Sequence, residues 1–117
     1  MSNLTVIQQK LLENLVDDSF DLFEIVSIVG SEMRGQGAAE QIASAKAVVR
    51  ELLDDQLVNA WILPSIGAEE VPLPLERLAD MFASDADWKL PIIEGARIRL
   101  FATPKGREAY VASGPPR

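Results

Sequence analysis

Paired acidic side chains are the residues of this chain that could act as general acids and bases or hold a metal ion. The pairs are Asp17/Asp18, Asp54/Asp55, Glu69/Glu70 and Asp85/Asp87. Each pair falls at an expected helix end or in a loop, where capping and solvation account for carboxylates, and adjacent helical residues do not face the same side. The 117 residues contain no Cys and no His, which removes thiol and imidazole nucleophiles and the usual zinc ligands. We therefore expect no catalytic residue, no metal site, no cofactor and no enzymatic activity.

Basic and polar side chains that could contact nucleic acid lie in the middle of the chain and towards its end. The candidates for DNA contacts are Arg34, Gln36, Ser44, Lys46, Arg50, Arg97 and Arg99. Lys and Arg neutralise phosphates, and Ser and Gln can hydrogen-bond to them. The simpler interpretation is ordinary solvated surface charge, and the net charge of −7 opposes binding to a polyanion. DNA binding therefore requires that the arginines form one positive strip, with the acidic residues on other faces.

The segment 38–62 is predicted to be a helix that leads directly into a strand. Apolar side chains recur at helical spacing along one side of its first part, at Ile42, Ala45, Val48, Val49, Leu52 and Leu53. Alternation of period two then predicts a strand over 57–63. Gln56 lies between the two, at the position where helices often end in a left-handed conformation.

Two helices before this segment, and a strand and a helix after it, complete the predicted core. Helical periodicity covers residues 4–16 and 20–33. A second alternating strand covers residues 96–102, so that it can pair with 57–63 as a hairpin. Thr103 followed by Pro104 predicts the start of the last helix, because Thr caps helices and Pro suits their first position.

Two of these segments, AAEQIASAKAVVRELLDDQLVNAWI (38–62) and IRLFATPKGREAYV (98–111), resemble winged-helix transcription regulators of the MarR and PadR types. They match the recognition helix with its first wing strand, and the end of the wing with the final helix. The resemblance implies an α+β winged helix, with a three-helix core, a two-stranded wing hairpin and a short C-terminal helix. It also implies a regulator that binds double-stranded DNA, commonly as a homodimer. Gln56 departs from the pattern, since these families usually have Gly there.

A long insertion, residues 64–95, separates the two strands of the expected hairpin. Within it, residues 74–84 predict a short amphipathic helix, with apolar side chains at Leu75, Leu78, Ala79 and Phe82. The apolar face of the insertion needs a cover. Either it folds back on its own domain, with Met81, Phe82 and Trp88 completing the core, or it presents these residues to a second subunit or another protein.

Taken together, the sequence predicts one winged-helix domain over residues 1–117, with a frayed tail at about 113–117. No stretch has the length and apolar character of a membrane span, and no signal peptide is apparent, so we expect a soluble cytoplasmic protein without a membrane partner. The predicted function is a small DNA-binding transcriptional regulator. The alternative is a winged-helix protein-interaction module that does not bind DNA and uses its acidic surface and the insertion. A buried Trp88 beside one positive strip would favour DNA, and an exposed Trp88 would favour interaction.

Overall fold

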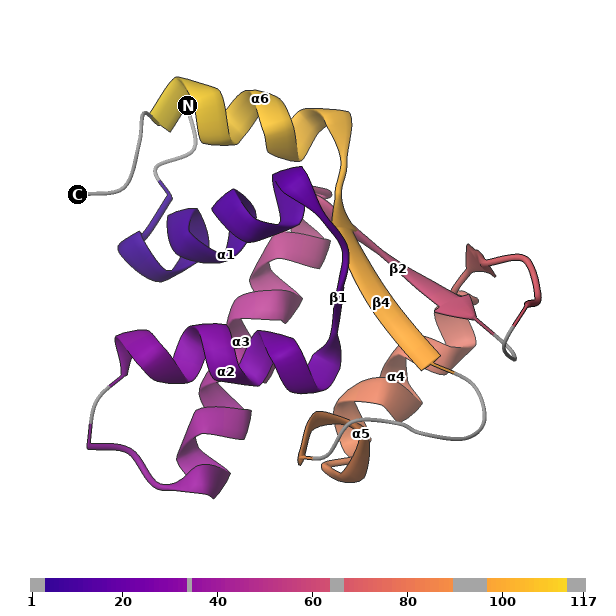
Figure 1. Ribbon diagram of the computed structural model, residues 1–117, viewed down its shortest axis with the longest axis horizontal. Helices are drawn as coiled ribbons and strands as arrows, with labels where there is room; N and C mark the ends of the chain where they lie inside the picture. Colours follow the sequence, from indigo (N-terminus) through magenta and orange to yellow (C-terminus); the bar gives the residue numbers. More distant parts are fainter. Residues whose placement is uncertain (1–3, 34, 64–66, 90–96, 114–117) are drawn as a thin grey trace.

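The computed structural model describes residues 4–33, 35–63, 67–89 and 97–113. Within these ranges the chain is an α+β structure with six helices and one four-stranded antiparallel sheet, as the sequence predicts for the fold class (Figure 1). The helices are α1 (Val6–Asp17), α2 (Leu22–Glu32), α3 (Ala38–Asp54), α4 (Leu75–Ala83), α5 (Ala86–Lys89) and α6 (Pro104–Ser113). The strands are β1 (Phe20–Asp21), β2 (Val58–Leu63), β3 (Val71–Pro72) and β4 (Arg97–Ala102). No described helix is both long and apolar enough to cross a membrane.

The first three helices pack together and supply most of the hydrophobic core. Thr5 is the N-cap of α1: its hydroxyl accepts a hydrogen bond from the Gln8 backbone N–H, and the Gln8 side chain accepts one from the Thr5 N–H. Side chains at helical spacing on each helix are fully buried, at Leu11, Leu12, Leu15, Ile25, Val29, Val49 and Leu52. The predicted three-helix core is therefore present, because the apolar faces read from the sequence meet one another.

The junction between α3 and β2 has the predicted left-handed turn. Gln56 has a φ of 61°, and its N–H donates to the Leu53 carbonyl at 3.0 Å. The next N–H, that of Leu57, donates to the Leu52 carbonyl at 2.9 Å. These two bonds satisfy carbonyls at the helix end that would otherwise have no partner. A non-Gly residue holds the turn here at a modest conformational cost.

The strands β2 and β4 form the predicted hairpin ladder over their full length. Val58 pairs with Ala102, and the register continues to Leu63 opposite Arg97. Along both strands, buried residues alternate with exposed or half-buried ones, so that one face of the sheet meets the core and the other points outward.

The prediction of one helix over residues 20–33 is wrong at its first two residues. Phe20 and Asp21 form β1, which pairs with Leu100 and Arg99 of β4, and α2 begins only at Leu22. The N–H of Asp21 donates to the Glu24 carboxylate at 3.1 Å, as at many helix starts. The sheet order is thus β1-β4-β2-β3, with β4 inside. Local periodicity could not show this strand, because its hydrogen-bond partner is about eighty residues away in the sequence.

The insertion folds back on its own domain through α4 and α5. Met81 and Trp88 are buried, and the Trp88 indole N–H donates to the Met81 carbonyl at 2.9 Å. The short helix α5 lies against α2 (Figure 1). The helix predicted over 74–84 is confirmed as α4, and Pro74 caps it rather than opening its first turn. Of the two alternatives for the insertion, folding back on its own domain is therefore the correct one for Met81 and Trp88.

The last helix begins as predicted. The Thr103 hydroxyl accepts a hydrogen bond from the Gly106 N–H at 2.9 Å, and Pro104 is the first helical residue. The helix α6 then runs beside α1 (Figure 1). The predicted tail at 113–117 lies outside the described residues except for Ser113, which ends α6.

Candidate interaction surfaces

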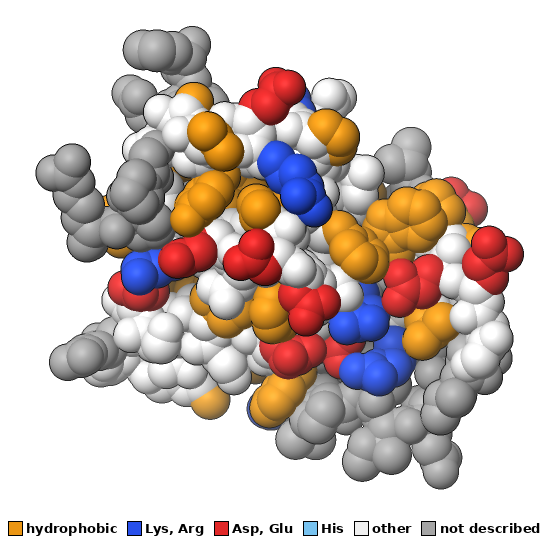
Figure 2. All heavy atoms as spheres, turned by 45° about the horizontal axis from the view of Figure 1, so that its top comes forward, with side chains coloured by type: hydrophobic (Ala, Val, Ile, Leu, Met, Phe, Trp, Pro, Cys, Tyr) orange, Lys and Arg blue, Asp and Glu red, His pale blue; other side chains and the backbone are white. Residues whose placement is uncertain are grey.

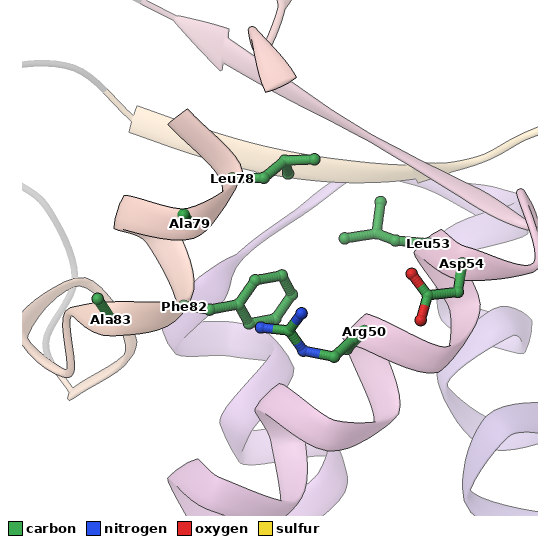
Figure 3. Close-up of a pocket in the computed structure, with 7 residues that line it drawn as sticks. All are labelled: Arg50, Leu53, Asp54, Leu78, Ala79, Phe82 and Ala83. Carbon is green, nitrogen blue, oxygen red and sulfur yellow. The ribbon is translucent and has the colours of Figure 1, made fainter. Parts of the chain in front are cut away.

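The two strongest candidate DNA contacts on α3, Lys46 and Arg50, are held by the insertion. Lys46 forms an ion pair with Asp85, the residue before α5. The guanidinium carbon of Arg50 lies 4.2 Å from the centre of the Phe82 ring, in cation–π geometry. Figure 3 shows the Arg50 side chain of α3 reaching the Phe82 ring of α4. The insertion therefore occupies the side of α3 from which these two cations would have to reach a phosphate backbone.

The polar candidates at the start of α3 are engaged with one another. The Ser44 hydroxyl donates to the Gln36 side-chain oxygen at 3.2 Å, and the Gln41 amide donates to the Gln36 carbonyl at 3.2 Å. Both Gln36 and Ser44 are half-buried. Arg34, the remaining candidate before α3, lies outside the described residues.

Arg97 and Arg99 of β4 belong to an ion cluster with Asp21 of β1 and Glu70, which we call the β4 ion cluster. Arg97 donates to Asp21, and this hydrogen bond, together with the charge of Asp21, raises the pKa of Arg97. The Arg99 Nε lies 3.4 Å from Asp21 Oδ1, an ion-pair distance without hydrogen-bond geometry. The other end of the Arg99 guanidinium lies 3.7 Å from the Glu70 carboxylate, and it also donates to the Ser19 carbonyl at 3.3 Å.

Among the described residues, the candidate DNA contacts do not form one strip of unpaired positive charge. Four of the seven candidates, Lys46, Arg50, Arg97 and Arg99, have an acidic or aromatic partner within the chain. Figure 2 shows blue side chains on the viewed face only as separate groups beside red ones. The structure thus brings Arg97 and Arg99 together with acidic partners and pairs Lys46 with Asp85, while the exposed Arg50 lies against the Phe82 ring.

Of the predicted interaction residues, only Phe82 is accessible. Met81 and Trp88 lie in the chain's own core, so neither offers a surface to a partner. Phe82 stacks on Trp88 with ring centres 6.0 Å apart and carries Arg50 within 4.2 Å. Beside it, a hollow of about 440 Å³ opens between α3 and α4, and Leu53, Asp54 and Leu78 line it with Phe82 and Arg50 (Figure 3).

The outward face of the sheet is a surface that the sequence interpretation missed. Trp61 of β2 and Phe101 of β4 lie on it with ring centres 6.2 Å apart at 82°, an edge-to-face pair. Beside them is a hollow of about 330 Å³ that Asn59, Thr103 and Pro104 also line. Exposed Pro72 of β3, which pairs with Trp61, continues this face along the sheet.

The signal for this face was present in the sequence. Period-two alternation places Trp61 and Phe101 opposite the core side of their strands, together with Arg97 and Arg99. Aromatic side chains on the solvent side of a strand are typical of contact surfaces.

Family models, curated proteins and solved structures contain no match to this chain. A functional conclusion therefore depends on how the side chains of α3, the insertion and the sheet are arranged. Among the described residues, no three acidic side chains lie close enough together to hold a metal ion.

The Lys46–Asp85 ion pair leads to a prediction about the pH dependence of stability. The hydrogen bond from Lys46 and its charge lower the pKa of Asp85, so the pair stabilises the fold above the ordinary Asp pKa of about 3.9. This stabilisation is lost as the pH falls through the lowered value. We expect Asp85→Asn to unfold at a slightly lower temperature than the wild type at pH 7, and at the same temperature near pH 2.

Thermal unfolding followed by circular dichroism across this pH range measures the difference. Asp80→Asn is the control, because Asp80 is exposed on α4 and forms no ion pair among the described residues. A difference between wild type and Asp85→Asn that persists at pH 2 would show that the ion pair is not its cause.

Proposed function

We propose that this chain is a winged-helix protein-interaction module that contacts a protein partner through the outward face of its sheet and does not bind duplex DNA. The observation that carries the proposal is that the cations needed for DNA binding already contact other side chains of this chain. Lys46 and Arg50 are held by the insertion, and Arg97 and Arg99 by Asp21 and Glu70. The order of three helices, hairpin and closing helix supports the winged-helix part of the proposal.

To bind phosphates, Arg97 and Arg99 would have to give up the contacts that they make within the chain. The Asp21 side chain is only 10% exposed, and Arg97 and Arg99 are its partners. Withdrawing both arginines towards a phosphate backbone would leave a carboxylate with little access to water, which is costly. The net charge of −7 adds long-range repulsion, because affinity for DNA comes largely from the release of counterions by clustered cations.

The outward face of the sheet has the composition of an interface centre. It combines an aromatic pair and an exposed proline with arginines that already have acidic partners. Aromatic residues and Arg are enriched at protein interfaces, and charges that lack a partner are depleted there. Within the described part of the chain, no helix packs on this face, since the core helices meet its other side (Figure 1).

DNA-binding regulation is the competing candidate, and the order of the elements favours it. It requires that Lys46 and Arg50 leave the insertion, or that other exposed cations supply the contacts. Lys105 and Arg107 near the start of α6 are exposed and form no ion pair among the described residues.

The deciding measurement is the binding of the full chain to a fluorescent random duplex between about 20 and 200 mM salt. We expect no binding even at the lowest salt concentration, because Lys46, Arg97 and Arg99 are paired with acidic side chains and the net charge is −7. Affinity that falls steeply with salt would contradict the proposal. If binding is observed, Arg50→Ala and the matched control Arg107→Ala locate the contact. A loss of binding in Arg50→Ala and not in Arg107→Ala would show that α3 contacts the DNA.

A further inference from the structure

We propose that the hollow beside Trp61 and Phe101 binds the side chain of an arginine in a basic segment of the protein partner. This inference rests on the proposed function, because it uses the same face of the sheet and names the chemistry of the partner. Two perpendicular aromatic rings, a carboxylate that can accept from a further cation and the charge of the whole chain support it in turn.

The two aromatic rings form a corner at one side of the hollow. Trp61 and Phe101 lie at 82° with ring centres 6.2 Å apart, and both line the hollow of about 330 Å³. The face of an aromatic ring attracts a cation, and the Trp ring attracts it most strongly. The chain already contains one contact of this kind, that of Arg50 with the Phe82 ring at 4.2 Å. A guanidinium is planar, so in the corner it can stack on one ring while its edge approaches the other.

Glu70 supplies negative charge in the wall of the same hollow. It is a lining residue, and its side chain is 27% exposed. Its carboxylate lies 3.7 Å from the Arg99 guanidinium, which is too long for a hydrogen bond, so its oxygens can still accept from another donor. Arg99 does not line the hollow, so the carboxylate is the nearer charge. Arg donates two parallel N–H bonds to a carboxylate whereas Lys offers a point charge, so the site suits arginine better than lysine.

The charge of the whole chain favours a basic partner and disfavours a second copy. The net charge of −7 attracts a cationic segment at long range and speeds its encounter with the chain. A second copy carries the same charge and is repelled. Lys105 opposes the attraction locally, because it is exposed and follows the lining residue Pro104. We therefore expect Lys105→Glu to strengthen the binding of arginine.

Titration of the isotope-labelled full chain with N-acetyl-arginine amide, followed by NMR, tests the site. The chain has two tryptophans, so their indole N–H signals report on two places separately. Trp88 is buried and donates to the Met81 carbonyl, so its signal is the internal control. We expect the Trp61 signal to shift with a dissociation constant of about 1 to 10 mM, since one side chain makes few contacts. N-acetyl-citrulline amide, which has nearly the same shape without the charge, should bind at least about tenfold more weakly.

Two variants test the carboxylate and the aromatic corner separately. Glu70→Gln removes the charge and Phe101→Leu removes one ring, and each should weaken binding about fivefold or more. Glu69→Gln is the matched control for the charge, because Glu69 is exposed and does not line the hollow. Circular dichroism confirms that each variant is folded.

Three results would overturn the inference. The first is a Trp61 signal that does not move at about 50 mM of the arginine probe, or that moves only together with the Trp88 signal. The second is equal affinity for the arginine and citrulline probes. The third is unchanged affinity in both Glu70→Gln and Phe101→Leu.

Free arginine as a second probe separates a protein side chain from a small molecule. Its charged α-amino and α-carboxylate groups are absent from an arginine within a peptide. We expect free arginine to bind no more tightly than the capped probe. A preference for free arginine of about tenfold or more would overturn the assignment to a protein partner.

The duplex titration decides the proposed function separately. A Trp61 signal that the arginine probe does not move, in a chain that also does not bind duplex DNA, overturns the arginine site and leaves the interaction module standing. A Trp61 signal that shifts with duplex DNA and not with the arginine probe overturns both.

Discussion

Replacing Trp88 with alanine is expected to lower the free energy of unfolding by about 3 to 5 kcal/mol. Trp88 is the largest fully buried side chain of the described residues, and it joins α5 to α2 and to the stacked Phe82 ring. Its removal leaves a cavity that rigid helices on several sides cannot close. Urea unfolding followed by far-UV circular dichroism measures the loss.

The conservative variant Trp88→Phe separates packing from hydrogen bonding. It keeps an aromatic ring but loses the indole N–H that donates to the Met81 carbonyl, so a loss of about 1 to 3 kcal/mol is expected. Trp61→Phe on the outward sheet face is the matched control, with an expected change within about 0.5 kcal/mol. Stability of Trp88→Ala within about 1 kcal/mol of the wild type would show that the insertion is not anchored by this side chain.

The second large effect is expected at Gly106, where alanine should destabilise the chain by about 2 kcal/mol or more. A Cβ at this position would lie 2.0 Å from the carbonyl oxygen of Leu57, which is a backbone atom. The same oxygen accepts a hydrogen bond from the Thr103 N–H at 3.0 Å. The helix α6 must therefore move away from the start of β2, and the Thr103–Leu57 hydrogen bond just before α6 is strained or lost.

Gly37→Ala is the matched control for Gly106→Ala. Gly37 caps α3 with a φ of −74°, and the nearest atom to an added Cβ is a Glu40 side-chain oxygen at 3.9 Å. We expect a cost of about 1 kcal/mol or less from the weaker cap alone. Urea unfolding of both variants on one preparation gives the comparison, and equal losses would contradict the close approach of α6 to β2.

Features that depend on neighbouring residues were predictable from the sequence. Local periodicity and capping residues predict three such features, and the structure has all of them. They are the step from α3 into β2, the left-handed Gln56 and the start of α6. The helix α4 was predicted for the same reason.

Features that depend on distant partners were not predictable from local patterns. The Asp21 carboxylate that holds Arg97 lies 76 residues before it, and nothing near either residue indicates the pairing. The same is true of Lys46 and Asp85, which are 39 residues apart. The burial of Trp88 could only be stated as one of two alternatives, because an amphipathic segment shows that its face needs a cover but not what covers it.

The position of β4 inside the sheet has a consequence for how the chain folds. Its partners β1 and β2 are synthesised some 40 to 80 residues before it, and neither can complete its pairing until residues 97–102 arrive. The helices α1 to α3 depend on contacts closer in sequence and can pack earlier. Contacts of long sequence separation slow folding, since the entropy of closing the intervening loop is lost before the pairing is gained. During synthesis on the ribosome, α1 to α3 would thus precede the sheet, and the aromatic pair of Trp61 and Phe101 would form only once β4 has been made.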